Sequence, residues 1–188
     1  NQTCNLYQIY YFLFLLPSKV RMTKNGILCE VNEKHVYLDP KKTDSTAINF
    51  VSHAHSDHLP SKNGGTILSS IETSAISDLR GFTMENHVES LDGFSLIDSG
   101  HVLGSKGLLF DDIFYTGDIC TRDRGFLKAA EIPSCKTLIT ECTFGLPEFK
   151  FPKMNEIQNY VNQLISDLYS KGVPVILMGY QLGKAQTI

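Results

Sequence analysis

The residues best suited to chemistry lie in one short stretch, where four potential metal ligands occur within six positions: His53, His55, Asp57 and His58. Imidazole and carboxylate groups together suit zinc or a similar divalent cation. Because alternate residues of an extended chain share a face, His53 and His55 can hold one metal while Asp57 and His58 hold a second. Two such ions side by side can activate a water molecule and bind a phosphoryl oxygen. The stretch therefore predicts a two-metal hydrolytic centre.

The elements that must deliver these side chains are strands, and further ligand-type residues follow later strands. An apolar run at residues 47–51 directly precedes His53 and predicts a buried strand. Three more ligand-type residues follow predicted strands, namely His101, Asp118 and Glu141. Singly, a strand-end acid is usually a turn former and a lone histidine is usually structural. Their shared position instead predicts one site at the edge of a sheet. The strands concerned are expected at residues 91–97, 107–110 with 113–115 as a hairpin, and 137–140.

Other segments predict the rest of the architecture. Residues 27–39 read as a hairpin, 67–69 as a short strand and 72–80 as a helix. The clearest helix is expected at residues 155–171, with Asn155 as N-cap, Gly172 as C′ residue and an apolar stripe packed on a core. The apolar run at residues 173–178 that follows predicts a parallel strand covered on both faces.

Composition sets the outer bounds. A chain of 188 residues with 42% hydrophobic and 20% charged residues can form one globular domain and part of another. The net charge of −3 is no electrostatic footprint for nucleic acid and is weak evidence against a nuclease, which the positive charge of bound zinc would offset. Locally, Arg122 and Arg124 follow Asp118 and could contact a phosphate backbone, although an ordinary solvated loop explains them equally well.

Cysteine usage and the first residues bear on localisation. Five cysteines without a CxxC pair indicate reduced thiols in a cytoplasmic protein. The apolar run at residues 6–16 is too short to span a bilayer, and it lacks the flanks of a secretory signal. We therefore expect no membrane association, and we interpret residues 1–21 as an N-terminal extension outside the fold.

The order and spacing of the motifs resemble the metallo-β-lactamase superfamily. The pattern His-x-His-x-Asp-His at residues 53–58, followed by Gly100-His101 and Gly117-Asp118, is similar to its metal-binding motifs, and Asp39 resembles the acidic residue that precedes them. Within the superfamily, the β-CASP nucleases, which cleave nucleic acid, carry motifs similar to residues 99–105, 139–145 and 179–186.

This resemblance implies a fold and a domain organisation. The expected class is α/β, an α+β sandwich with the αββα layers of the metallo-β-lactamase fold. The fold would be incomplete, with a catalytic region at residues 22–145 and the start of a truncated β-CASP cap domain at residues 146–188. The family pattern needs further histidines, and none follows His101. We therefore expect a fragment that holds the first metal more tightly than the second.

The resemblance also implies a role for each site residue. The first zinc ion would be held by His53, His55 and His101, the second by Asp57 and His58, and both would be bridged by Asp118; manganese is the alternative metal. Asp57, Asp118 and Glu141 would form the catalytic set, with Glu141 orienting a histidine that this chain does not contain. Apart from the resemblance, Lys184 lies in a turn that is expected to open a helix and could bind a phosphate at the helix N-terminus, although the spacing does not match a P-loop.

The expected function is metal-dependent hydrolysis of phosphodiester bonds in nucleic acid, either RNA or single-stranded DNA. The resemblance favours an exonuclease in RNA processing. The alternatives are a DNA-repair exonuclease of the ligase-associated type, a thioester or lactam hydrolase on the same fold, and an inactive subunit that binds RNA or a partner. A homodimer is a further arrangement that the sequence leaves open.

Overall fold

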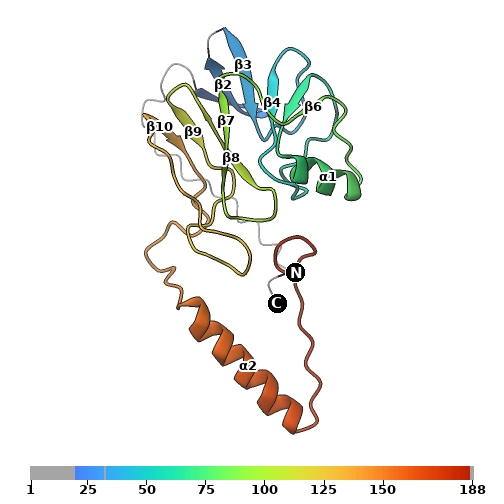
Figure 1. The fold of residues 1–188 in the computed structure, drawn as a ribbon, viewed down its shortest axis with the longest axis vertical. Helices are drawn as coiled ribbons and strands as arrows, with labels where there is room; N and C mark the ends of the chain where they lie inside the picture. The colour runs from blue at the N-terminus through green and yellow to red at the C-terminus, as the bar shows by residue number, and fades with distance from the viewer. Residues whose placement is uncertain (1–19, 32, 187–188) are drawn as a thin grey trace.

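The computed structural model describes residues 20–31 and 33–186, which form a sandwich of two β-sheets and an extended C-terminal region (Figure 1). In the first sheet, β1 to β3 are antiparallel and β3 to β6 are parallel. In order, its strands are β1 (Val20–Thr23), β2 (Gly26–Val31), β3 (Lys34–Leu38), β4 (Ile48–Phe50), β5 (Thr66–Leu68) and β6 (His87–Val88). Helix α1 (Ile71–Leu79) lies beside this sheet.

The second sheet has the spatial order β10-β9-β8-β7, with β10 parallel to β9 and the other pairs antiparallel. Its strands are β7 (Phe94–Asp98), β8 (Lys106–Phe110), β9 (Ile113–Tyr115) and β10 (Thr137–Ile139). One core cluster joins the two sheets, with Phe50 and Leu68 from the first packed among Leu108 and Phe110 from the second. Because side chains alternate along a strand, each sheet buries one face in this core. The predicted two-sheet α/β sandwich is confirmed.

The strands that the sequence predicted before the ligand-type residues are present. β4 ends at Phe50, shortly before the 53–58 stretch. β8 and β9 pair as the expected hairpin, and β9 runs directly into the segment that carries Asp118. β10 ends two residues before Glu141. The chain therefore presents its candidate site at strand ends, as predicted.

The N-terminal boundary needs correction. β1 begins at Val20, which pairs with Cys29 and is buried in the core cluster. Val20 and Arg21 therefore belong to the first sheet, although we expected residues 1–21 to lie outside the fold. The apolar Val20 side chain explains the difference, because it fills a position facing the sandwich. Residues 1–19 lie outside the described part of the chain.

Helix α2 (Met154–Ser170) confirms the predicted helix but corrects its start. Its N-cap is Lys153, whose carbonyl accepts hydrogen bonds from the amides of Glu156 and Ile157, so Asn155 lies inside the first turn. Gly172 has a φ of 69° just beyond the helix, as expected of a C′ residue.

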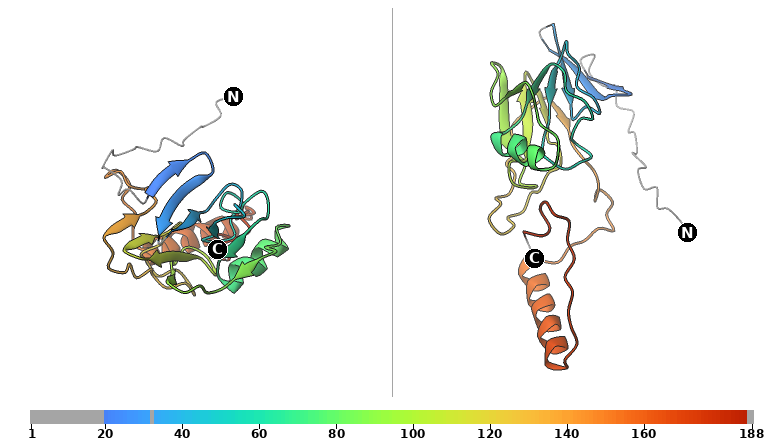
Figure 2. Two further views of the ribbon diagram at one scale, coloured as in Figure 1. Left: turned by 90° about the horizontal axis from the view of Figure 1, so that it is seen from above. Right: turned by 90° about the vertical axis from the view of Figure 1, so that its right-hand side faces the viewer.

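The predicted burial of α2 and of residues 173–178 is wrong for the described chain. α2 has no buried residue, and Tyr160 on its apolar stripe is 70% exposed. Residues 173–178 form no strand, and Ile176 is 83% exposed. The physical reason is visible in Figures 1 and 2, where both segments extend away from the sandwich and meet no sheet. No helix in the described residues is long and apolar enough to cross a membrane.

Candidate metal centre

Four ligand-type side chains converge where the strands end. One ligand atom from each of His53, His55, His101 and Asp118 lies within 4.8 Å of the others. His55 Nδ1 is 2.9 Å from His53 Nε2 and 3.3 Å from His101 Nε2. Nitrogen lone pairs that face one another repel unless a proton or a cation lies between them. Three imidazoles and one carboxylate at this spacing therefore fit a zinc-type ion.

The carboxylate of Asp118 faces two groups of ligands at once. Its Oδ2 atom lies 3.8 Å from His53 Nε2 and 3.4 Å from His101 Nε2, whereas Oδ1 lies 3.4 Å from His58 Nε2. Asp57 Oδ2, on the exposed rim, is 3.9 Å from His58 Nε2. A cation on this second side would find His58, Asp57 and one oxygen of Asp118. Asp118 is therefore suited to bridge two ions. The second side has fewer histidine ligands than the first.

Hydrogen bonds to the ring nitrogens that face away from the metal group orient His53 and His58. The side chain of Asp39 accepts hydrogen bonds from His58 Nδ1 at 2.8 Å, from Ser52 Oγ at 2.6 Å and from the Tyr115 hydroxyl at 2.8 Å. Ser52 Oγ also lies 2.9 Å from His53 Nδ1 and can accept its proton. Both rings then keep the Nε2 lone pair for a metal. Asp39 therefore orients one histidine directly and another through Ser52.

Sequence reasoning did not single out Ser52 or Tyr115. The signals that could have identified them are weak. Ser52 directly precedes His53, and Tyr115 ends an apolar strand with a hydroxyl that, once buried, requires a partner. Asp39 itself was selected only by resemblance. Its left-handed backbone, with a φ of 43°, fits the sharp turn at the end of β3.

Burial and charge divide the histidines into two kinds. Burial holds the pKa of His53 far below its ordinary value. Repulsion from positive charge on His58, His101 and His55 adds to the effect. Burial lowers the pKa of His101 to about 4, and His55 and Arg124 add to the effect. Both rings are therefore neutral at pH 7, which is the form that binds metals.

The pKa values of His58 and Asp118 are instead raised above their ordinary values. Burial alone would lower the pKa of His58, but the hydrogen bond and charge of Asp39 outweigh it and raise that pKa to about 9. Burial also raises the pKa of Asp118, against the opposing effect of His58. A proton on His58 therefore occupies the second side until a cation replaces it.

Glu141 lies next to the centre through the backbone. Its Oε1 accepts a hydrogen bond from the amide of Ile119 at 2.9 Å, and its Oε2 accepts one from Thr143 Oγ1 at 2.6 Å. Glu141 therefore fixes the peptide that follows Asp118. Its predicted action on a further histidine stays a prediction.

The three cations predicted to contact substrate have different partners in the structure. Arg124 donates hydrogen bonds from Nη2 to the carbonyls of His101 and Gly100, so it braces the loop that carries a ligand. Arg122 instead lies over the ring of Phe151 at 5.5 Å, and Lys184 lies over the ring of Tyr180 at 4.7 Å. Of the three, only Arg124 contacts the metal-binding loops through a described hydrogen bond, and substrate binding by all three stays a prediction.

Comparisons with known proteins bear on family. No family model matches the chain. A probable DNA ligase of Opitutus terrae is 33% identical over 158 residues, which are 74% of this chain and 15% of that protein. Endoribonuclease YSH1 of Kluyveromyces lactis is 34% identical over 101 residues, which are 50% of this chain and 13% of that protein. The chain thus spans about a seventh of the length of these relatives.

The comparison with solved structures includes a metallo-β-lactamase. The crystal structure of a metallo-β-lactamase from Hirschia baltica is 15% identical, with a TM-score of 0.34, over 56% of this chain and 66% of that one.

Proposed function

We propose that this chain, a member of the β-CASP branch of the metallo-β-lactamase superfamily, is the metal-binding part of a nuclease that hydrolyses phosphodiester bonds of nucleic acid. The observation that carries the proposal is the convergence of three imidazoles and the Asp118 carboxylate within 4.8 Å. The family relation supports the activity. A thioester or lactam hydrolase would share the metal group, but it would not account for the similarity to an endoribonuclease.

In this proposal each side chain has a stated task. His53, His55 and His101 hold the first cation, Asp57 and His58 hold the second, and the two oxygens of Asp118 reach both. Bound zinc, or manganese, supplies a water of lowered pKa and neutralises charge that develops on the phosphate.

The surrounding residues keep these ligands in place. Asp39 holds the Nδ1 proton of His58, so that Nε2 stays directed at the cation. Glu141 acts through the backbone after Asp118 and is a positioning residue in this scheme. Arg124 anchors the His101 loop through its hydrogen bond to the His101 carbonyl, and in this proposal it is also a candidate contact for a substrate phosphate.

For the substrate we propose RNA, and exonucleolytic cleavage rests on the motif resemblance alone. Similarity to an endoribonuclease supports RNA as the substrate class. A second candidate is processing of single-stranded DNA, because the longest of the reported matches is to a probable DNA ligase. Contacts that read a 2′-hydroxyl would separate the two. The third candidate, an inactive subunit that binds RNA, predicts binding without turnover.

The test is cleavage of matched, end-labelled single-stranded RNA and DNA by the natural protein that contains this chain, with zinc or manganese. Asp118→Ala is the control. We expect degradation of RNA that the variant does not perform. Degradation of DNA alone would favour the DNA-processing candidate. Retention of both strands by the unmodified protein, with or without binding, would overturn the nuclease proposal.

A further inference from the structure

His55 has a partner far from the sandwich. Its Nε2 atom lies 3.1 Å from the carbonyl oxygen of Leu182, 127 residues later in the chain. A carbonyl oxygen only accepts hydrogen bonds, so His55 Nε2 must carry the proton. In the neutral ring the lone pair is then on Nδ1, the atom that faces His53 and His101. This hydrogen bond therefore selects the tautomer in which His55 can serve as a ligand.

The turn that carries Leu182 approaches the metal loops through a glycine. Gly183 has a φ of 92°, which side chains rarely tolerate, and a Cβ atom there would lie 2.8 Å from Val102 Cγ1. Val102 is buried and directly follows His101. Glycine at this position thus brings the turn against the loop of a second ligand.

One side chain holds both flanks of Leu182. The Oε1 atom of Gln186 accepts a hydrogen bond from the Gly183 amide at 2.7 Å, and its Nε2 atom donates one to the carbonyl of Gln181 at 2.8 Å. A backbone bond from the Ala185 amide to the Tyr180 carbonyl, at 3.0 Å, closes the turn. The direction of the Leu182 carbonyl is therefore set by the internal bonds of the turn at residues 180–186, which we call the C-terminal turn.

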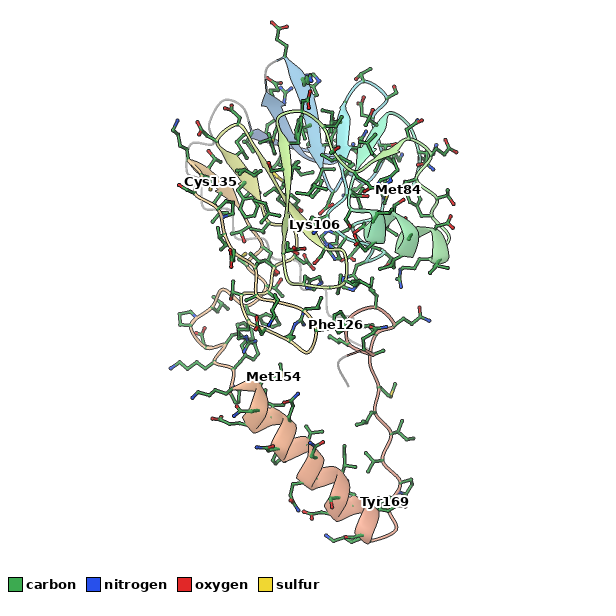
Figure 3. All side chains as sticks on the ribbon, viewed as in Figure 1. Met84, Lys106, Phe126, Cys135, Met154 and Tyr169 are labelled. Atoms are coloured by element: carbon green, nitrogen blue, oxygen red, sulfur yellow. The ribbon has the colours of Figure 1, made fainter. Side chains whose placement is uncertain are left out.

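The other oriented histidines take their partners from the sandwich itself. His53 lies against Ser52, and His58 donates to Asp39. For His55, the partner comes from a segment that reaches the sandwich only after α2 and residues 173–178 (Figure 3). Ligand orientation at the first cation is thus linked to the placement of the C-terminal region.

We propose that the C-terminal turn is a positioning element for the first metal, with the Leu182 carbonyl holding His55 so that Nδ1 is the ligand. This inference rests on the metal centre of the proposed function. Partners of metal-bound histidines typically contribute 10- to 100-fold to metal affinity. Displacing the turn should therefore weaken the first cation, and it should free the His55 ring to exchange tautomers.

The experiment measures zinc affinity of the whole chain by competition with a chromophoric chelator, together with the absorption spectrum of the cobalt(II) form. Gly183→Val, which blocks the approach to Val102, should lower affinity about 10- to 100-fold and alter the cobalt spectrum. Gln186→Ala should have a smaller effect, and Gln186→Glu, which keeps the acceptor for Gly183, should recover part of it. Tyr169→Ala is the control, because this side chain is 82% exposed on α2 and lies outside both the C-terminal turn and the metal centre.

A second measurement does not require metal. Nitrogen-15 shifts of the His55 ring in the metal-free chain should report a proton on Nε2, and Gly183→Val should mix the two tautomers. Thermal unfolding of each variant checks that the sandwich is intact. Unchanged affinity and an unchanged His55 tautomer in Gly183→Val and Gln186→Ala would overturn the inference. If Asp118→Ala still weakens zinc binding in that case, the proposed metal centre stands; if Asp118→Ala has no effect either, the centre itself fails.

Discussion

The sandwich and the C-terminal region carry similar apolar patterns but reach opposite outcomes. In the sandwich, apolar strands such as β4 and β8 place Phe50 and Leu108 at 0% exposure. Beyond residue 150, the helical stripe of α2 and the run at residues 173–178 remain exposed. Apolar periodicity thus states which face a segment can bury. Whether it is buried depends on a second surface within reach.

The two regions also differ in what they contribute to the site. The side chains of the metal group all come from loops that follow strands of the sandwich. The C-terminal region contributes a backbone carbonyl, that of Leu182, to the ring of His55. The ligand side chains and the core therefore belong to the same region, and the C-terminal region meets the site through the Leu182 carbonyl and the packing of Gly183 against Val102. Four predictions test this division.

The largest expected effect is on metal binding by the sandwich. Asp118→Ala removes the carboxylate that faces both groups of histidines, so we expect zinc binding at both sides to weaken and cleavage to be lost. Zinc titration and a cleavage assay on the natural protein measure this. Asp112→Ala, at the acidic turn between β8 and β9, removes an exposed carboxylate paired with Lys136 and should leave both readouts unchanged. A variant at Asp118 with near-normal cleavage would break the division.

The next effect concerns stability in the two regions. Phe50→Ala leaves a cavity between the sheets and should lower the free energy of unfolding by about 3–5 kcal/mol. Tyr160→Ala, on the exposed face of α2, should change it by less than about 0.5 kcal/mol. Urea unfolding followed by far-ultraviolet circular dichroism compares them. Equal losses would show that α2 is packed in solution and would remove the contrast.

The sequence predicted the sandwich better than the C-terminal region. The strands before His53, Asp118 and Glu141 were predictable, because their apolar runs are short, bounded by turns and buried by partners inside the chain. The N-cap at Lys153 was missed, because a backbone carbonyl starts that helix without a side-chain cap. The burial of residues 173–178 failed as a prediction, since sequence pattern does not reveal whether a neighbouring strand is present.

The site was predictable in its side chains and not in its hydrogen bonds. Residue type and spacing identified all four members of the converged group, including His101 and Asp118. The partners behind them, Ser52, Tyr115 and the Leu182 carbonyl, were not identified. Their contribution depends on which atom faces which, and residue identity does not encode that. A carbonyl in particular is present in every residue and carries no sequence signal.

A third prediction concerns the two sides of the metal group. Asp39→Asn removes the negative charge that holds His58 through Nδ1, so the second cation should bind about 10- to 100-fold more weakly, and the first less so. Isothermal titration calorimetry with zinc resolves the binding of the first cation from the binding of the second. Tyr115→Phe, which removes a single hydrogen bond to Asp39, should shift the second event by a smaller factor. Equal weakening of both events in Asp39→Asn would show that Asp39 supports the centre as a whole.

The last prediction tests burial in the sandwich through pH. Burial raises the pKa of the Cys29 thiol from 9.0 to about 12, because its thiolate would lie in the core. A raised folded pKa means that the stabilising contribution is complete below pH 9 and is lost as the pH rises toward 12, since the unfolded chain releases its proton first. Unfolding free energy should therefore fall by up to about 1.4 kcal/mol per pH unit above pH 9 relative to Cys29→Ser, in which this group does not titrate. Cys142→Ser, an exposed position beyond the sandwich, should retain the slope of the unmodified chain. If Cys29→Ser kept that slope as well, the thiol would be ionised in the native state, and the core around β2 would be open to water.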